Sequence, residues 1–304
     1  MLTLRDLVKL ADANEAALDH PIADFAIGDR VFDTDSEPVV MGVVNLSRDS
    51  TYRESIAPTR KDAVRRARIM YEQGAHVVDI GAESSRADAG RATAENQIAS
   101  LMPVIEELSD AGVPTSIESY ELEVIRAGLA AGAAVVNLTG TKDELAIYEA
   151  VGSHGASLVM CFTPGETVRD GLDVQIAADP IPALMEHFGP RIEAARKCGV
   201  NSVAIDPGLG FFYGSRVGPI RKAQHQAQVL LHSFRLRPLG VPVCQITPHA
   251  FDIFQEEFRT AEGVFTVLAS LGGVGVLRVH EVPRVVASLT MMHTVGVDLP
   301  ESSD

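Results

Sequence analysis

Cysteine is scarce in this chain. Its 304 residues include three cysteines, Cys161, Cys198 and Cys244, and no two of them form a C-x-x-C pair. An odd number of well-separated cysteines predicts buried, reduced thiols and a cytoplasmic location. The amino-terminal segment carries charges throughout, and no uncharged apolar run reaches about 18 residues, so we predict neither a signal peptide nor a membrane span.

Positive charge is also limited. The chain has 26 Lys and Arg residues against 41 Asp and Glu residues, which gives a formal net charge of -15. This excess of negative charge argues against a nucleic acid or an anionic membrane as a partner. An anionic substrate would need a local cluster of cations or backbone N–H groups to overcome the field of the whole protein.

Several familiar nucleotide and metal motifs are missing. The sequence contains no G-x-x-x-x-G-K-[ST] phosphate loop and no H-E-x-x-H motif, and GGVG at 272–275 lacks the spacing of a dinucleotide-binding loop. The histidines do not cluster at zinc-ligand spacing. A phosphate-bearing ligand would therefore depend on side chains brought together by the fold.

Short apolar runs are abundant, and each is followed by a longer helical pattern. The runs are rich in Val and Ile and show little alternation, which is typical of strands buried on both faces. The eight runs are residues 39–46, 76–81, 113–118, 134–140, 157–162, 202–206, 241–246 and 274–279. Eight strand-then-helix units predict an α/β fold, a (β/α)8 barrel, with an open doubly wound sheet as the alternative.

The helical patterns complete these units. They cover residues 60–73, 94–111, 121–131, 142–152, 180–198, 219–235, 255–271 and 281–293. Thr59 is the expected N-cap of the first, and Gly74 follows it as a C′ glycine. We expect an N-terminal helical extension at 1–24, the barrel at 25–296 and a flexible tail at 297–304.

Polar side chains gather where the predicted strands end. A polar side chain on an apolar strand costs free energy unless it is paired, so each one alone could be a satisfied core contact. A whole set at the same end of successive strands favours one polar pocket, suited to a flat heterocycle with hydrogen-bonding edges. Arg86, Arg278 and His280 together could hold an anionic group such as a phosphate. The set comprises Asn45, Asp79, Glu118, Asn137, Asp206, Arg278 and His280.

These segments resemble the signatures of the dihydropteroate synthase family. MGVVNLSRDS (41–50), DIGAESSR (79–86) and SIESYELEV (116–124) are followed in the family's order by VVNLTG, IDPGLGF and RVHEV. The similarity runs from about Phe25 to about Val295. It implies a pterin-binding TIM barrel and a commonly homodimeric transferase of folate biosynthesis. Such an enzyme joins 6-hydroxymethyl-dihydropterin diphosphate to para-aminobenzoate and releases diphosphate with the help of Mg²⁺.

The resemblance also implies roles for individual residues. The pterin would be bound by Asp79, Glu118, Asn137, Asp206 and Gln245. The diphosphate would be bound by Asn45, Ser85, Arg86, Arg278 and His280. The catalytic set would be Asn45, Asp49, Arg278 and His280. Asn45 would also sit by the metal, and Asp49 lies on the first loop, which in the family helps to order the aminobenzoate site.

Some positions depart from the family pattern. Arg48 stands where the family has proline, and Glu118 replaces an aspartate, so its carboxylate reaches one methylene further. The family ends its seventh strand with Gly-x-Ser-Arg-Lys, whereas residues 241–251 read VPVCQITPHAF. Gln245 or His249 could take the place of the lysine, but neither carries a permanent positive charge.

Three functions remain open at this point. A divergent synthase, acting on para-aminobenzoate or on a modified aminobenzoate, agrees with the changed first loop and seventh strand. A pterin-dependent corrinoid methyltransferase would share the barrel but would not need the diphosphate residues. A non-catalytic homologue that binds a pterin would agree with the loss of Ser-Arg-Lys.

Overall fold

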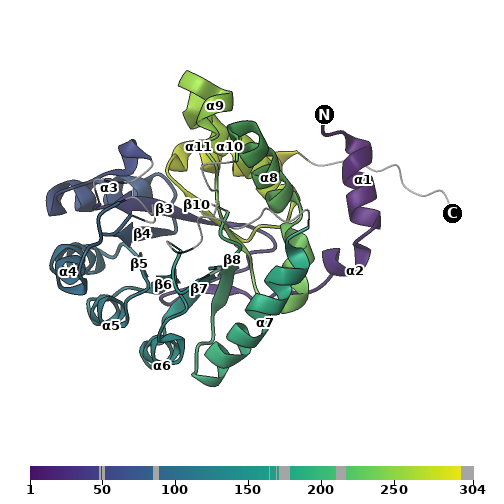
Figure 1. Ribbon diagram of the computed structural model, residues 1–304. Coiled ribbons are helices and arrows are strands. Elements are labelled where there is room, and N and C mark those ends of the chain that lie inside the picture. Colours follow the sequence, from purple (N-terminus) through teal and green to yellow (C-terminus); the bar gives the residue numbers. More distant parts are fainter. Residues whose placement is uncertain are drawn as a thin grey trace.

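Eight parallel strands lie at the centre of the molecule and helices surround them (Figure 1). The computed structural model describes residues 1–47, 49, 52–84, 89–163, 165–168, 170, 179–209 and 217–295. The strands are β3 (Val39–Asn45), β4 (Val77–Gly81), β5 (Thr115–Ser119), β6 (Val135–Leu138), β7 (Ser157–Cys161), β8 (Val203–Asp206), β9 (Cys244–Ile246) and β10 (Val276–Val279).

The strands form a closed ring. Their hydrogen-bonded order is β8-β7-β6-β5-β4-β3-β10-β9, and a parallel bridge between Ile205 and Val243 joins the two ends. The Ile205 N–H donates to the Pro242 carbonyl at 3.0 Å. This closure confirms the predicted (β/α)8 barrel and excludes the doubly wound sheet, which would leave two open edges.

Each barrel strand except β9 is followed by one α-helix, and a short 3-10 helix at Arg53–Ser55 precedes the first of these. The α-helices are α3 (Arg60–Glu72), α4 (Ala94–Asp110), α5 (Leu122–Ala130), α6 (Glu144–His154), α7 (Ile181–Lys197), α8 (Pro219–Leu231) and α11 (Val282–Thr294), and between β9 and β10 lie α9 (Phe251–Phe254) and α10 (Phe258–Leu271). Thr59 caps α3 as predicted, accepting from the Asp62 N–H. The helix predicted over 219–235 is shorter, because Ser233–Leu239 forms a 3-10 segment that contains Pro238.

Two apolar layers hold the barrel together. Outward-facing strand residues such as Val44 and Ile117 pack against the helices, and inward-facing residues such as Val77 and Val135 fill the amino-terminal half of the interior. A hairpin of β1 (Phe25–Ile27) and β2 (Arg30–Phe32), which we did not predict from the sequence, covers that end with buried Phe25. Because this half is filled with apolar side chains, polar groups collect at the opposite end.

The N-terminal extension contains two helices, α1 (Leu4–Asp12) and α2 (Glu15–Leu18). Figure 1 shows α1 at the periphery, away from the strands, and none of its residues is buried. The predicted tail at 297–304 lies outside the described residues. No described helix has the length and apolar character needed to cross a bilayer.

Candidate active site

A cavity of about 250 Å³ opens at the carboxyl ends of the strands. Its described wall comes from β3, β4, β5, β9 and β10, from the segments that follow β3, β4, β9 and β10, and from helices α8 and α9. The polar part of this wall contains Asn45, Tyr52, Asp79, Glu83, Ser84, Glu118, Lys222, Gln226, Thr247, His249, Asp252, Arg278 and His280. In a barrel this face carries the strand–helix loops, where ligand sites are built.

Asp79 is the centre of a buried hydrogen-bond network. Its carboxylate accepts from the Ser116 hydroxyl at 2.7 Å and from the Asn137 side-chain amide at 2.8 Å. Burial raises the pKa of Asp79 above its ordinary range. The other amide atom of Asn137, Oδ1, is buried and has no hydrogen-bond partner among the described residues. It is therefore an acceptor that a ligand N–H could satisfy.

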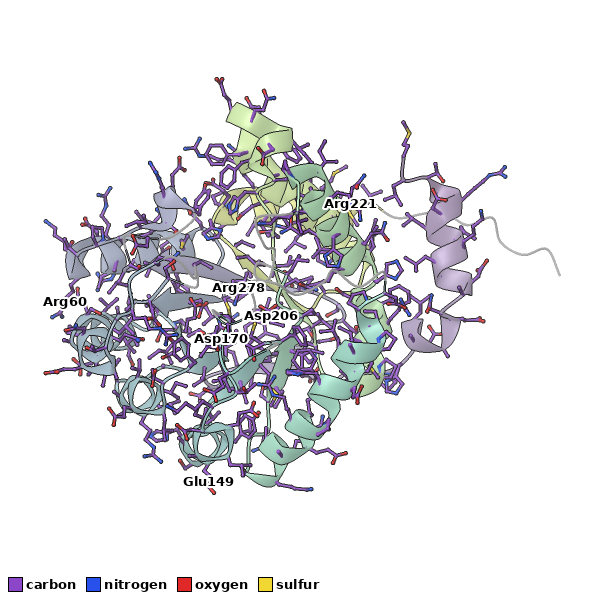
Figure 2. All side chains as sticks on the ribbon, viewed as in Figure 1. Arg60, Glu149, Asp170, Asp206, Arg221 and Arg278 are labelled. Carbon is purple, nitrogen blue, oxygen red and sulfur yellow. The ribbon has the colours of Figure 1, made fainter. Side chains whose placement is uncertain are left out.

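Arg278 and Asp206 form a buried ion pair at the floor of the cavity (Figure 2). The guanidinium nitrogen lies 3.0 Å from the Asp206 carboxylate, whose other oxygen accepts from the Gly208 N–H at 2.8 Å. Burial raises the pKa of Asp206, although Arg278 opposes this. Burial alone would lower the pKa of Arg278, but neighbouring carboxylates, Asp206 foremost, raise it, so Arg278 remains a cation.

Glu118 projects from the end of β5 into the same cavity. The register pairs it with Gly81 on one side and Asn137 on the other. Burial, and then the charge of Asp79, raise the pKa of Glu118 to about 7. A Cβ atom on Gly81 would meet Glu118 Oε2 at 2.7 Å, so the carboxylate occupies space that only a glycine at position 81 leaves open.

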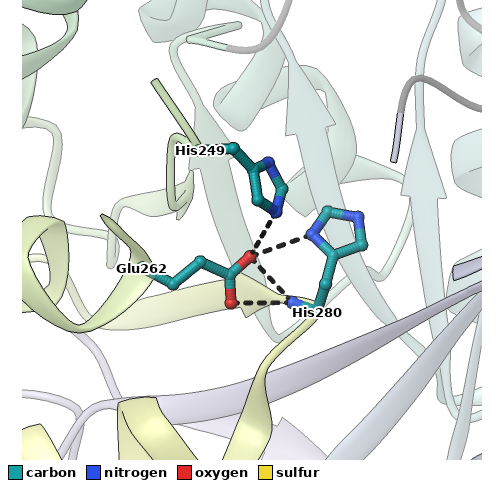
Figure 3. Close-up of side chains that lie close together, drawn as sticks. All are labelled: His249, Glu262 and His280. Atoms are coloured by element: carbon teal, nitrogen blue, oxygen red, sulfur yellow. Dashed lines mark hydrogen bonds and ion pairs between the residues drawn. The ribbon is translucent and has the colours of Figure 1, made fainter. Parts of the chain in front are cut away.

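A further buried carboxylate, Glu262 of α10, holds two imidazoles (Figure 3). Glu262 Oε1 lies 3.0 Å from His280 Nδ1 and 3.1 Å from His249 Nε2, and Oε2 accepts from the Glu281 N–H at 2.8 Å. Burial would raise the pKa of Glu262, but hydrogen bonds from His249 and His280 hold it at about 2. The Tyr52 ring stacks on His249 with centroids 4.2 Å apart. Glu262 is therefore ionised and both histidines are fixed in place.

Comparison with known proteins agrees with this geometry. Residues 41–280 match a family model described as pterin binding enzyme. The chain belongs to the pterin-binding enzyme family. The family prediction from the sequence is confirmed, and the matched residues span the barrel from β3 to the end of β10.

Relatives of this pterin-binding enzyme include dihydropteroate synthases. The Bacillus subtilis dihydropteroate synthase is 25% identical over 84% of this chain and 87% of its own length. A probable bifunctional folylpolyglutamate synthase/dihydropteroate synthase of Halobacterium salinarum is 30% identical over 82% of this chain, which spans only 30% of that longer protein. The Xanthomonas albilineans dihydropteroate synthase, solved with 4-aminobenzoic acid, has a TM-score of 0.74 and 29% identity, covering 90% of this chain and 98% of that one.

The pterin-binding barrel brings together most residues that we predicted for its site. Those on the cavity wall are Asn45, Asp79, Glu118, Arg278 and His280. Asn137 and Asp206 lie directly behind this wall, where they bond to Asp79 and Arg278. The Asn45 side-chain amide donates to the Ser55 hydroxyl at 2.7 Å, which orients it within the wall.

Gln245 is a correction to the predicted pterin set. Its side chain faces the outer helical layer, where the amide donates to Ser233 Oγ at 3.1 Å. The reason is strand alternation, since Cys244 and Ile246 point inward and their neighbour must point outward. His249, the other candidate for the missing lysine, does line the cavity.

Three further predicted residues are not placed on the described wall. Asp49 is exposed, and its backbone carbonyl accepts from the Ser84 hydroxyl at 3.0 Å. Ser85 and Arg86 lie outside the described residues, so their diphosphate role stays a prediction.

Several site residues were missed by sequence reasoning. We considered polar residues at the ends of strands. We therefore missed three residues that lie elsewhere, namely Glu262, Lys222 and Tyr52. Glu262 did leave a signal, because it shares its helical face with Phe265 and Ala269, both buried apolar residues. A charged residue within such a stripe is almost never fully buried unless it is paired.

Proposed function

We propose that this protein is a dihydropteroate synthase-type transferase, which joins 6-hydroxymethyl-dihydropterin diphosphate to para-aminobenzoate or a modified aminobenzoate. One observation carries the proposal. Asp79, Glu118 and Arg278 line a single cavity, and Asn137 and Asp206 bond to them from below. Five polar residues from five different strands thus surround one space at the face where barrel enzymes bind ligands.

A pterin matches the hydrogen-bonding capacity of this set. Its ring edge presents N–H and amino donors beside a carbonyl and ring nitrogens, and carboxylates and amide oxygens accept from such donors. Asn137 Oδ1 is a buried acceptor without a partner among the described residues, which costs about 1–3 kcal/mol that a ring N–H would recover. An analogue without these donors would leave the same groups unpaired, which gives the site selectivity.

Hydrogen-bond donors on the cavity wall support the leaving-group half of the reaction. In the proposed step the acceptor's amine nitrogen attacks the pterin methylene carbon, the carbon–oxygen bond breaks, and diphosphate leaves with the bonding electron pair. The amine then loses one proton. Arg278 is a permanent cation on the cavity wall, and His280 lines the wall beside it. Prearranged donors at the departing oxygens stabilise the charge that develops there.

A magnesium ion fits the proposed site through Asn45. Oxygen is the ligand that Mg²⁺ prefers, with one or two protein groups plus substrate phosphate oxygens and water. Asn45 lines the cavity and its Nδ2 donates to the Ser55 hydroxyl, so a metal at this residue would be bound through the amide oxygen. When bound, Mg²⁺ would neutralise charge on the departing diphosphate.

The second substrate would lie toward α8. Lys222 lines that side of the cavity and supplies a positive charge suited to an aminobenzoate carboxylate. Burial lowers its pKa below the ordinary lysine value. The segment after β9, with Pro248 and His249 on the wall, borders the same side and supports a modified acceptor as well as the simple one.

We also propose a cytoplasmic homodimer. All three cysteines are free thiols, as expected for a reducing compartment. Val264 of α10 and Met291 of α11 are exposed on two helices that pack together, and a second copy could cover them. Sedimentation equilibrium of the purified protein would test the dimer, which a monomer at micromolar concentration would contradict.

A pterin-binding protein without turnover is the second candidate. The observation that favours it is the composition of β9, whose residues Cys244–Ile246 include no cation where the family has a lysine, and whose Gln245 is bonded to Ser233 outside the cavity. Calorimetry with 6-hydroxymethyl-dihydropterin diphosphate and Mg²⁺, followed by product assays with para-aminobenzoate and its ribosylated form, separates the two. Binding with product formation supports the transferase, binding without product from either acceptor supports the second candidate, and absence of binding rejects both.

A further inference from the structure

The cluster of His249, Glu262 and His280 lies at the cavity wall and carries two nitrogen ligands and one oxygen ligand (Figure 3). The ligand atoms all lie within 4.8 Å of one another. The residues come from separate elements, since His249 follows β9, Glu262 lies in α10 and His280 follows β10. We propose that these three side chains form a binding site for one divalent transition-metal ion such as Zn²⁺.

The ligand set selects the class of metal. Two imidazoles and one carboxylate suit Zn²⁺, Fe²⁺ or Co²⁺, whereas Mg²⁺ takes oxygen ligands almost exclusively. Three protein ligands also leave at least one coordination position for water or a substrate atom. Since His249 and His280 both line the cavity, that position would face the bound ligand. This metal is therefore distinct from the Mg²⁺ proposed at Asn45.

The distances are already close to those of a metal site. Metal–ligand bonds of about 2.0–2.1 Å in a tetrahedron place neighbouring ligand atoms about 3.3 Å apart. Glu262 Oε1 lies 3.1 Å from His249 Nε2 and 3.0 Å from His280 Nδ1. Because all the ligand atoms lie within 4.8 Å of one another, the two imidazole nitrogens are at most about 1.5 Å further apart than the tetrahedral spacing, and metal binding would require them to close on the ion by no more than that.

The cluster is also held in place by its surroundings. Glu262 Oε2 accepts from the backbone N–H groups of His280 and Glu281, at 3.0 and 2.8 Å, which fixes the carboxylate while Oε1 faces the imidazoles. The His249 ring stacks against Tyr52 and Phe251. Supporting contacts of this kind orient metal ligands and tune their affinity.

A hydrogen-bonded network without metal is the competing interpretation. In it, each imidazole carries a proton on the nitrogen that faces Glu262, and the carboxylate only positions the two rings. A metal would need both lone pairs, so each proton would move to the outer nitrogen. Only direct measurement of metal binding separates the two cases.

The test measures metal uptake by the full chain. Protein stripped with a chelator is titrated with Zn²⁺ by calorimetry and with Co²⁺ by visible absorption, without any pterin. We expect one equivalent per chain, a Co²⁺ spectrum of low coordination number, and no displacement by millimolar Mg²⁺. Absence of uptake, or a spectrum unchanged in the variants below, would overturn the proposal and leave the hydrogen-bonded network.

Variants show which residues hold the metal. His249→Ala removes a half-buried wall residue and should fold, and Glu262→Gln keeps the shape of the buried side chain. Loss of a supporting contact already costs about 10- to 100-fold in metal affinity, so loss of a ligand should cost at least that. His154→Ala, an exposed histidine on α6, is the matched control and should bind like the unmodified protein. Metal binding is measured without substrate, so its failure is distinguishable from failure of the proposed function.

Discussion

Arg278 and Asp206 lie 3.0 Å apart across the strand β9 that separates their own strands. Both side chains are buried, and each neutralises the charge of the other. Either charge alone would be unpaired in the low-dielectric interior of the barrel. The pair also joins the two halves of the proposed site, since Asp206 belongs to the pterin set and Arg278 to the diphosphate set. A substitution in one half of the site should therefore also affect ligand binding in the other half.

Asp206→Ala should destabilise the folded protein. It leaves Arg278 as an uncompensated buried cation, and breaking a buried pair costs about 3–5 kcal/mol. We expect about 3 kcal/mol in the free energy of unfolding, because Asp79 and Glu118 also lower the cost of the Arg278 charge. Urea denaturation at neutral pH measures it. The double variant Asp206→Ala/Arg278→Ala should be less destabilised than the sum of the single variants, and an additive result would contradict the pairing.

Asn137→Ala should weaken pterin binding while the barrel stays folded. The variant removes Oδ1, an acceptor with no partner in the described part of the chain, and the hydrogen bond to Asp79. We expect a loss of about 1–3 kcal/mol in affinity for 6-hydroxymethyl-dihydropterin diphosphate, measured by calorimetry. Asn96→Ala, an exposed asparagine on α4, is the control. Unchanged affinity in a folded Asn137→Ala protein would remove Asn137 from the pterin site.

Stability should fall as pH rises through the titration of Glu118. Its pKa is about 7 in the folded protein against an ordinary value of 4.5. Below that ordinary value both states are protonated, whereas between pH 4.5 and about 7 only the folded state keeps the proton, so rising pH favours unfolding. We expect a loss of about 3 kcal/mol across this window, since each unit of pKa difference is worth about 1.4 kcal/mol.

Glu118→Gln isolates that effect. The amide cannot titrate, so the difference in unfolding free energy between the original protein and the variant should change across the window. Asp79 and Asp206 also titrate upward from their ordinary values, but they do so in both proteins. Denaturation curves at closely spaced pH values give the difference. A difference independent of pH would show that Glu118 titrates at its ordinary value.

Gly81→Ala should weaken pterin binding without removing any polar group. The new Cβ would approach Glu118 Oε2 to 2.7 Å, and the flexible carboxylate must move away. We expect about a tenfold loss of affinity, or about 1.4 kcal/mol. Adding Glu118→Asp, which shortens the side chain, should recover part of it. Gly90→Ala, where a Cβ meets nothing within 4 Å, is the control, and equal effects of the two alanines would contradict the role of the contact.

The sequence by itself determined the barrel and the level of its polar site. Runs of Val and Ile that are buried on both faces are local patterns of the sequence. Eight such runs in alternation with helices are compatible with only a few chain topologies. Residues such as Asn137 and Asp206 stand at the ends of these runs, and parallel strands bring such ends to one face.

Only the tertiary structure decided which side chains meet. Gln245 and His249 are four residues apart and equally plausible in the sequence, but strand alternation turns Gln245 outward while the chain after β9 brings His249 to the cavity. Glu262 reaches His280 because α10 lies against the segment that follows β10, a contact between elements that no local pattern encodes. Strand and helix periodicity act over a few residues, whereas the pairing of buried charges depends on closure of the whole barrel.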